Sequence, residues 1–89
     1  MCRNIRTLFN FEPPVTDEEI RAASLQFVRK VSGFNKPSKG NEAAFLAAIE
    51  QIAAVSRNLL STLETKAPPR TREAEAAKAQ ARAAQRFSR

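Results

Sequence analysis

The sequence predicts an all-α fold, a small helical bundle built on an antiparallel pair of helices over residues 17–32 and 42–65. Three observations indicate it. Apolar residues recur at helical spacing in both segments. Glycine and proline lie at the ends of the segments rather than inside them. Of the 20 large apolar residues in a chain of 89, 19 precede residue 66, which leaves room for one small core.

Residues 1–14 form an N-terminal arm that ends at Pro13 and Pro14, where a helix cannot continue. Its apolar spacing fits one helical turn and also fits a strand, so periodicity does not decide between them. Because four large apolar groups are costly to leave in water, we expect the arm to fold onto the core. These groups are Ile5, Leu8, Phe9 and Phe11.

The first predicted helix, 17–32, begins at a capping box. Thr16 and Glu19 have the spacing at which each side chain can bond the other's backbone amide. Gly33 has the residue type that ends helices in a left-handed conformation. The apolar face between these signals consists of Ile20, Ala23, Phe27, Val28 and Val31.

A polar connector precedes the second predicted helix, 42–65, for which Asn41 is the expected N-cap and Pro68 the barrier to continuation. The helix has an apolar stripe wide enough to touch two neighbouring elements. Leu25 and Leu46 lie at the edges of their stripes and are candidates for a partner surface. The stripe consists of Phe45, Ala48, Ile49, Ile52, Val55, Leu59, Leu60 and Leu63.

A third helix is predicted over about 71–87, capped by Thr71 and rich in alanine, the best helix former. Its apolar face is thin, so two outcomes stay open: it docks through its alanines and Phe87, or it frays. We therefore expect one domain, with a core and arm in residues 1–66 and a basic helix or tail in 67–89.

The residues that the chain lacks exclude several kinds of chemistry. With no His and one Cys, neither a zinc site nor a Ser–His–Asp or Cys–His centre can be assembled. The acidic residues are not spaced as a cation-binding loop, and Gly33 and Gly40 match no phosphate-binding motif. We expect no metal and no cofactor, and the inventory favours a protein without enzymatic activity while leaving a thiol-dependent activity of Cys2 open.

The expected location is the cytoplasm. A single cysteine forms no internal disulfide, so nothing argues for secretion. The N-terminus carries no apolar run of signal-peptide length, and we expect no later stretch to approach a membrane span.

Charge points to an anionic partner. The chain carries a net charge of +6, of which residues 67–89 hold +4 from six basic and two acidic groups. Nucleic acid and acidic protein surfaces are natural partners of such a tail, although the same charges also keep an alanine-rich helix in solution. A base-reading helix is not indicated, because the second helix is acidic and the chain has no Tyr or Trp for stacking. The candidate contacts are Arg3, Arg6, Lys36, Lys39, Arg72, Lys78, Arg82 and Arg86.

Cys2 is the remaining reactive side chain. Arg3 beside it would lower the pKa of its thiol, which makes a nucleophilic or redox role conceivable. The chain offers no second Cys to resolve an oxidised thiol and no His to activate it, so the alternative is a thiol that is merely packed.

The sequence also resembles a known family. The stretches that carry the likeness are MCRNIRTLFNFEPP at the start, SGFNKPS in the connector and APPRTREAEAAKAQARAAQRF at the end. They are similar to the small bacterial proteins grouped as domain-of-unknown-function family 2277. The resemblance implies a bacterial, cytoplasmic, stand-alone protein, and it supplies no catalytic residues.

Three functional hypotheses follow from the sequence. The first is a non-enzymatic binding module whose basic C-terminal helix contacts an acidic protein or a nucleic-acid backbone. The second is a thiol-dependent enzyme or redox protein that uses Cys2. The third is a structural subunit that associates with itself through the alanine face, which makes the protein a monomer or a weak homodimer. None of the three involves a membrane.

Overall fold

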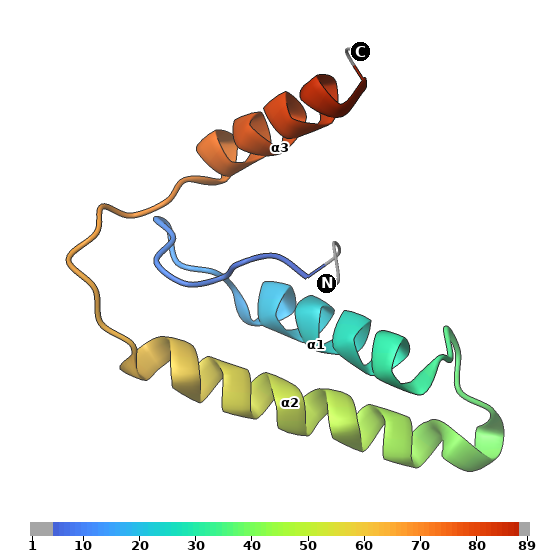
Figure 1. Cartoon of the computed structure of the whole chain (residues 1–89). Helices are drawn as coiled ribbons and strands as arrows, with labels where there is room; N and C mark the ends of the chain where they lie inside the picture. Colours follow the sequence, from blue (N-terminus) through green and yellow to red (C-terminus); the bar gives the residue numbers. More distant parts are fainter. Residues whose placement is uncertain (1–4, 88–89) are drawn as a thin grey trace. The chain divides into compact units, whose positions relative to one another are not determined.

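The computed structural model describes residues 5–87 and confirms the predicted all-α class (Figure 1). Helix α1 spans Asp17–Ser32, α2 spans Glu42–Thr62 and α3 spans Arg72–Phe87. A short 3₁₀ turn, Lys39–Asn41, leads directly into α2. Within the described part of the chain no strand forms.

The chain divides into two compact units. One contains residues 5–9 and 15–64, and therefore α1 and α2; the other contains residues 10–14 and the chain from residue 65 onward, and therefore α3. The division after residue 64 falls between α2 and α3. The second division falls inside the predicted N-terminal arm, whose two ends belong to different units.

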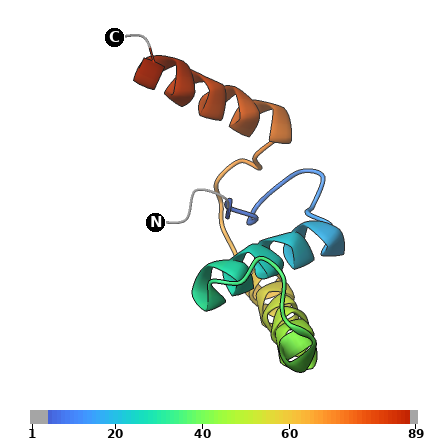
Figure 2. The ribbon, with the colours of Figure 1, turned by 90° about the vertical axis from the view of Figure 1, so that its right-hand side faces the viewer.

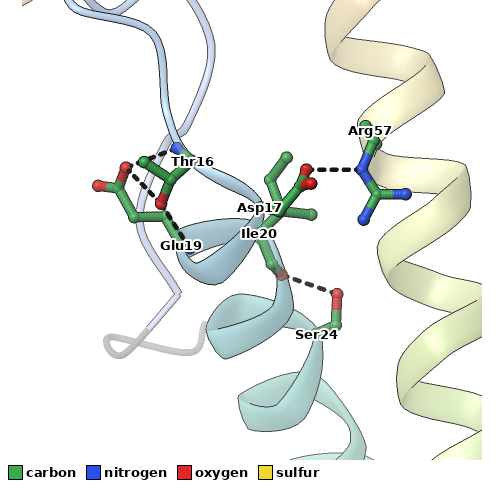
Figure 3. Close-up of polar contacts among 6 residues, drawn as sticks. All are labelled: Thr16, Asp17, Glu19, Ile20, Ser24 and Arg57. Atoms are coloured by element: carbon green, nitrogen blue, oxygen red, sulfur yellow. Dashed lines mark hydrogen bonds and ion pairs between the residues drawn. The ribbon is translucent and has the colours of Figure 1, made fainter.

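Helix α1 has the predicted boundaries because both of its ends are capped locally. The Glu19 amide donates to Thr16 Oγ1 at 3.2 Å, and the Thr16 amide donates to Glu19 Oε1 at 2.8 Å, which completes the capping box (Figure 3). At the other end Gly33 adopts φ 79° and donates its N–H to the Arg29 carbonyl.

Helix α2 begins at the predicted residue, Glu42, but differs from the prediction in its N-terminal cap and in its end. Asn41 makes no side-chain cap, because the preceding 3₁₀ turn holds its backbone in a helical conformation instead of the extended one that capping needs. The helix ends at Thr62, three residues before the predicted end. The Ser61 and Thr62 hydroxyls both donate to the Asn58 carbonyl, and Leu63 is extended. Side chains that bond the backbone in this way compete with helix continuation.

The core is a single row of side chains from each helix, and α1 and α2 lie side by side and antiparallel (Figures 1 and 2). Each row has the i, i+4, i+8 spacing of one helix face. Ser24, the buried polar member, donates its hydroxyl to the Ile20 carbonyl at 2.9 Å, so its burial leaves no unmet hydrogen bond (Figure 3). The rows are Ile20, Ser24 and Val28 in α1, and Phe45, Ile49 and Ala53 in α2.

Two ion pairs join the edges of the helix pair. Arg21 meets Glu50 at 2.8 Å, and Arg57 meets Asp17 at 2.8 Å (Figure 3). All four side chains are about half exposed or more, so each pair contributes at most about 1 kcal/mol. Their role is to fix the register between α1 and α2 rather than to supply stability.

The first part of the N-terminal arm lies on the core, as predicted. Ile5 and Leu8 are half-buried and line a groove together with side chains of α1 and α2. Residues 5–8 form neither a helix nor a strand, and Asn10 has a positive φ of 65°. Neither of the regular conformations suggested by the apolar spacing is adopted.

The segment Lys39–Thr62, which contains α2, is long and apolar enough to cross a membrane by length and composition. This finding, from a search of the described residues, corrects the expectation that no stretch approaches a membrane span. A core helix of a small bundle meets the same criterion, and α2 uses one of its faces to bury Phe45, Ile49 and Ala53 against α1.

The cap at the start of α1 gives a first prediction. Thr16→Ala removes the side-chain acceptor for the Glu19 amide and is expected to lower the free energy of unfolding by about 1 kcal/mol. Urea unfolding followed by circular dichroism measures the change. Thr7→Ala, at an exposed position outside the helices, is the matched control and should change stability little. Equal effects of the two substitutions would contradict the capping role.

Candidate functional site

The start of α3 is fixed by a side-chain cap. The Ala74 amide donates to Thr71 Oγ1 at 3.1 Å, which confirms Thr71 as the predicted capping residue. Helix α3 then begins at Arg72, one residue after the predicted start.

The segment before α3 is paired with the end of the N-terminal arm, an arrangement that we call the clasp and define as residues 10–14 with 67–72. The Arg70 amide donates to the Asn10 carbonyl at 2.7 Å, and the Glu12 amide donates to the Arg70 carbonyl at 2.9 Å. The Asn10 side-chain amide donates to the carbonyls of Ala67 at 3.3 Å and Pro68 at 3.1 Å. Backbone amides and carbonyls that lie about 60 residues apart in the sequence are therefore hydrogen-bonded to one another.

Arg72 completes the clasp with its guanidinium. It donates to the Pro13 carbonyl at 2.9 Å and to the Pro14 carbonyl at 3.3 Å, and it lies over the Phe11 ring at 5.5 Å from the centroid. Proline has no N–H but keeps its carbonyl acceptor, and a planar guanidinium can donate to two acceptors at once. Arg72 was predicted as an anion contact; in the structure it anchors the first turn of α3 to residues 11–14.

The remaining basic residues of α3 share one face. Lys78 and Arg82 are both exposed, and their i, i+4 spacing places them about 6 Å apart along the axis. Lys78 lies 3.4 Å from Glu75, a contact that leaves 65% of the lysine side chain exposed. Arg86 follows at the same spacing in sequence, but its side chain and that of Phe87 lie outside the described residues.

The other predicted contacts belong to the unit formed by α1 and α2. Arg6 is exposed at the rim of the groove, and Lys36 and Lys39 are exposed in the connector between the helices. Arg3 and Cys2 lie outside the described residues, so the predicted thiol chemistry stays a prediction. The structure places Lys78 and Arg82 together on one helix face. Arg72 instead hydrogen-bonds within the clasp.

The groove beside α1 and α2 has a volume of about 260 Å³ and a mainly apolar lining. Arg6 is the charged side chain among the described lining residues, and the Ser24 hydroxyl is already committed to the Ile20 carbonyl. The groove therefore offers an apolar contact surface and no pair of groups suited to proton transfer. Its helical lining is Ile20, Ala23, Ser24, Phe27, Ile52, Ser56, Leu59 and Leu60.

Sequence reasoning missed the clasp. The available signal was indirect: two proline pairs hold the residues before them extended, and extended segments can pair. Nothing in the local sequence indicates that residues 10–14 pair with residues 67–72. The contact between Arg72 and Phe11 depends on that pairing, so the sequence did not predict it either.

These features define the class of protein: a small all-α protein with a helical hairpin, formed by α1 and α2, and a separately clasped basic helix. The family model described as "Uncharacterized conserved protein (DUF2277)" matches residues 1–78, so the chain belongs to this family. The match includes α1, α2, the clasp and Lys78, and it ends before Arg82. Comparison with curated proteins and with solved structures gave no match.

The role of Arg72 can be tested by hydrogen exchange. Arg72→Lys keeps the charge but loses the two-carbonyl geometry and the stacking on Phe11, a loss of about 1 kcal/mol at this partly exposed site. The Glu12 and Arg70 amides, both bonded within the clasp, should then exchange about fivefold faster by NMR. Arg82→Lys is the control and should leave both rates unchanged. Unchanged rates in Arg72→Lys would contradict the anchoring role.

Proposed function

We propose that this protein is a non-enzymatic binding module whose helix α3 contacts an anionic partner, either a nucleic-acid backbone or an acidic protein surface. The observation that carries the proposal is the exposed basic face of α3, with Lys78 and Arg82 one helical turn apart. Arg86 extends this row in the sequence.

The arrangement of α3 supports a binding role in two ways. Its first turn is anchored by the Thr71 cap and by Arg72, so the basic face is carried by an ordered helix rather than by a disordered tail. Like charges at i, i+4 repel, and the Glu75 contact with Lys78 offsets part of the repulsion between Lys78 and Arg82. An anion bound along this face would relieve the repulsion that remains.

The contact expected from such a face is electrostatic and independent of base sequence. Lysine and arginine side chains on one helix face bind phosphates or carboxylates through charge-assisted hydrogen bonds. The chain has no Tyr or Trp for base stacking, and its large apolar residues are concentrated in the unit formed by α1 and α2. Affinity should therefore depend strongly on salt and weakly on sequence.

The test is binding of labelled RNA and DNA duplexes, measured by fluorescence anisotropy between 50 and 200 mM salt, a range over which the Debye length falls from about 14 to about 7 Å. Three phosphate contacts predict a slope of log K against log salt of about −2.7. The variant Lys78→Glu/Arg82→Glu should lose at least about tenfold in affinity at the lowest salt. The control Lys30→Glu/Lys66→Glu changes the net charge equally at two exposed residues that are not among the candidate contacts, and it should bind within about twofold of the unaltered protein.

Two outcomes contradict parts of this proposal. Equal losses in the two double variants would show that net charge, and not the face of α3, carries the binding. No binding to nucleic acid at the lowest salt would end the nucleic-acid version. Polyglutamate then serves as the acidic polypeptide probe, and failure of the protein to bind it as well would overturn the proposal.

A further inference from the structure

The end of the hairpin where α1 passes into α2 carries unbalanced positive charge (Figure 1). We call residues 29–42 the hairpin tip; they hold four basic residues and one acid, Glu42, a net charge of +3. On the sides of the hairpin, by contrast, Arg21 and Arg57 are paired with acids of the facing helix. Within the part of the chain that the structure describes, three exposed lysines of the tip make no side-chain hydrogen bond and no ion pair: Lys30, Lys36 and Lys39.

Large apolar side chains are exposed in the same segment. Val31, in the last turn of α1, is 70% exposed, and Phe34, just after the helix, is 49% exposed. Scattered exposed apolar residues are common on protein surfaces. Here, however, they alternate with unpaired cations over a few residues, which is the combination of side chains that proteins place at a membrane surface.

The backbone of the tip is held by its own hydrogen bonds. Gly33 donates its N–H to the Arg29 carbonyl, and Arg29 Nε donates to the Asn35 carbonyl at 3.1 Å. The Phe34 amide donates to Ser32 Oγ at 3.2 Å. Because these bonds order the chain on both sides of Phe34, the exposed side chains need little further ordering when a partner binds.

We propose that the hairpin tip binds the surface of an anionic membrane. The lysines contact the phosphates and carboxylates of the lipid headgroups, and Val31 and Phe34 enter the boundary between the headgroups and the acyl chains. Charge complementarity supports this occupant, since such a surface is negative at the headgroups and apolar directly beneath them. The contact is peripheral, because α1 and α2 keep their buried rows against each other.

Other anionic partners match the tip less well. A nucleic-acid strand offers phosphates to the lysines and a base to Phe34, but it has no apolar interior for Val31. An acidic protein surface matches the lysines alone. The basic face of α3 differs in this respect, since the apolar residues of α3 before Phe87 are all alanines. The tip and α3 are therefore assigned different partners, and the proposal for the tip does not rest on the function proposed for α3.

Co-sedimentation of the full chain with phosphatidylcholine vesicles, prepared with and without phosphatidylserine, tests the proposal. Binding should require phosphatidylserine and weaken as salt is added. Lys36→Gln/Lys39→Gln should lower the affinity about 25-fold, because each lysine near an anionic surface contributes about fivefold. The control Lys78→Gln/Arg82→Gln removes the same charge from α3 and should lower it no more than about threefold. Equal losses in the two variants would show that net charge and not the tip carries the binding, and would overturn the proposal.

The apolar part of the contact has its own matched pair of variants. Val31→Ser should lower vesicle affinity at least about fivefold, because the lost side chain no longer leaves water on binding. Val55→Ser is the same change at a position that is also 70% exposed, about 20 Å along α2 from its start, and should leave the affinity unchanged. Circular dichroism checks that both variants keep the helical content of the unaltered protein. Equal effects of the two substitutions would contradict insertion of the tip.

Fluorescence gives an independent readout of insertion. Phe34→Trp places a tryptophan in a chain that has none, and its emission should shift to shorter wavelengths when phosphatidylserine vesicles are added. Unshifted emission from the bound protein would contradict insertion of the tip. No binding to these vesicles at low salt would overturn the proposal, and loss of RNA binding in Lys36→Gln/Lys39→Gln would then assign the tip to nucleic acid. Neither result bears on α3, whose test uses other residues.

Discussion

The contact between one row of α1 and one row of α2 is the interaction on which the rest of the structure depends. Ile20, Ser24 and Val28 meet Phe45, Ile49 and Ala53, and these are the buried residues of the described chain. Burying a large aliphatic or aromatic side chain stabilises by about 1.5–3 kcal/mol, and the core of this hairpin buries four of them, Ile20, Val28, Phe45 and Ile49. This small core is accompanied by the capping box of α1, by two ion pairs and by the first part of the N-terminal arm.

The narrowness of this core also determines what stays exposed. The apolar stripe of α2 spans enough of the helix to contact two neighbours, and α1 occupies one side of it. The other side contains Val55 and Leu59, whose side chains are apolar like those of the core but are exposed.

The sequence predicted correctly those features that are determined by contacts between residues close together in the chain. The boundaries of α1 follow from Thr16, Glu19 and Gly33, whose bonds reach no farther than four residues, and the structure has the same boundaries. Thr71 was identified for the same reason. The end of α2 was misjudged because the Thr62 hydroxyl competes for carbonyls of its own helix, whereas the prolines that were taken as the limit lie farther on. Leu46 is exposed, as suggested for a stripe edge, but Leu25 packs against the core.

The candidate site was harder to predict, because its geometry rests on contacts between distant segments. Sequence alone placed Arg72 with Lys78, Arg82 and Arg86, since all four are basic and lie on one side of a helical wheel. The backbone pairing of residues 10–14 with 67–72 gives Arg72 two proline carbonyls and an aromatic ring, and no local pattern encodes that pairing. The basic row that remains, Lys78 and Arg82, belongs to one unit, and the exposed apolar residues Val55 and Leu59 belong to the other. Positive charge and exposed apolar surface are thus separated along the chain.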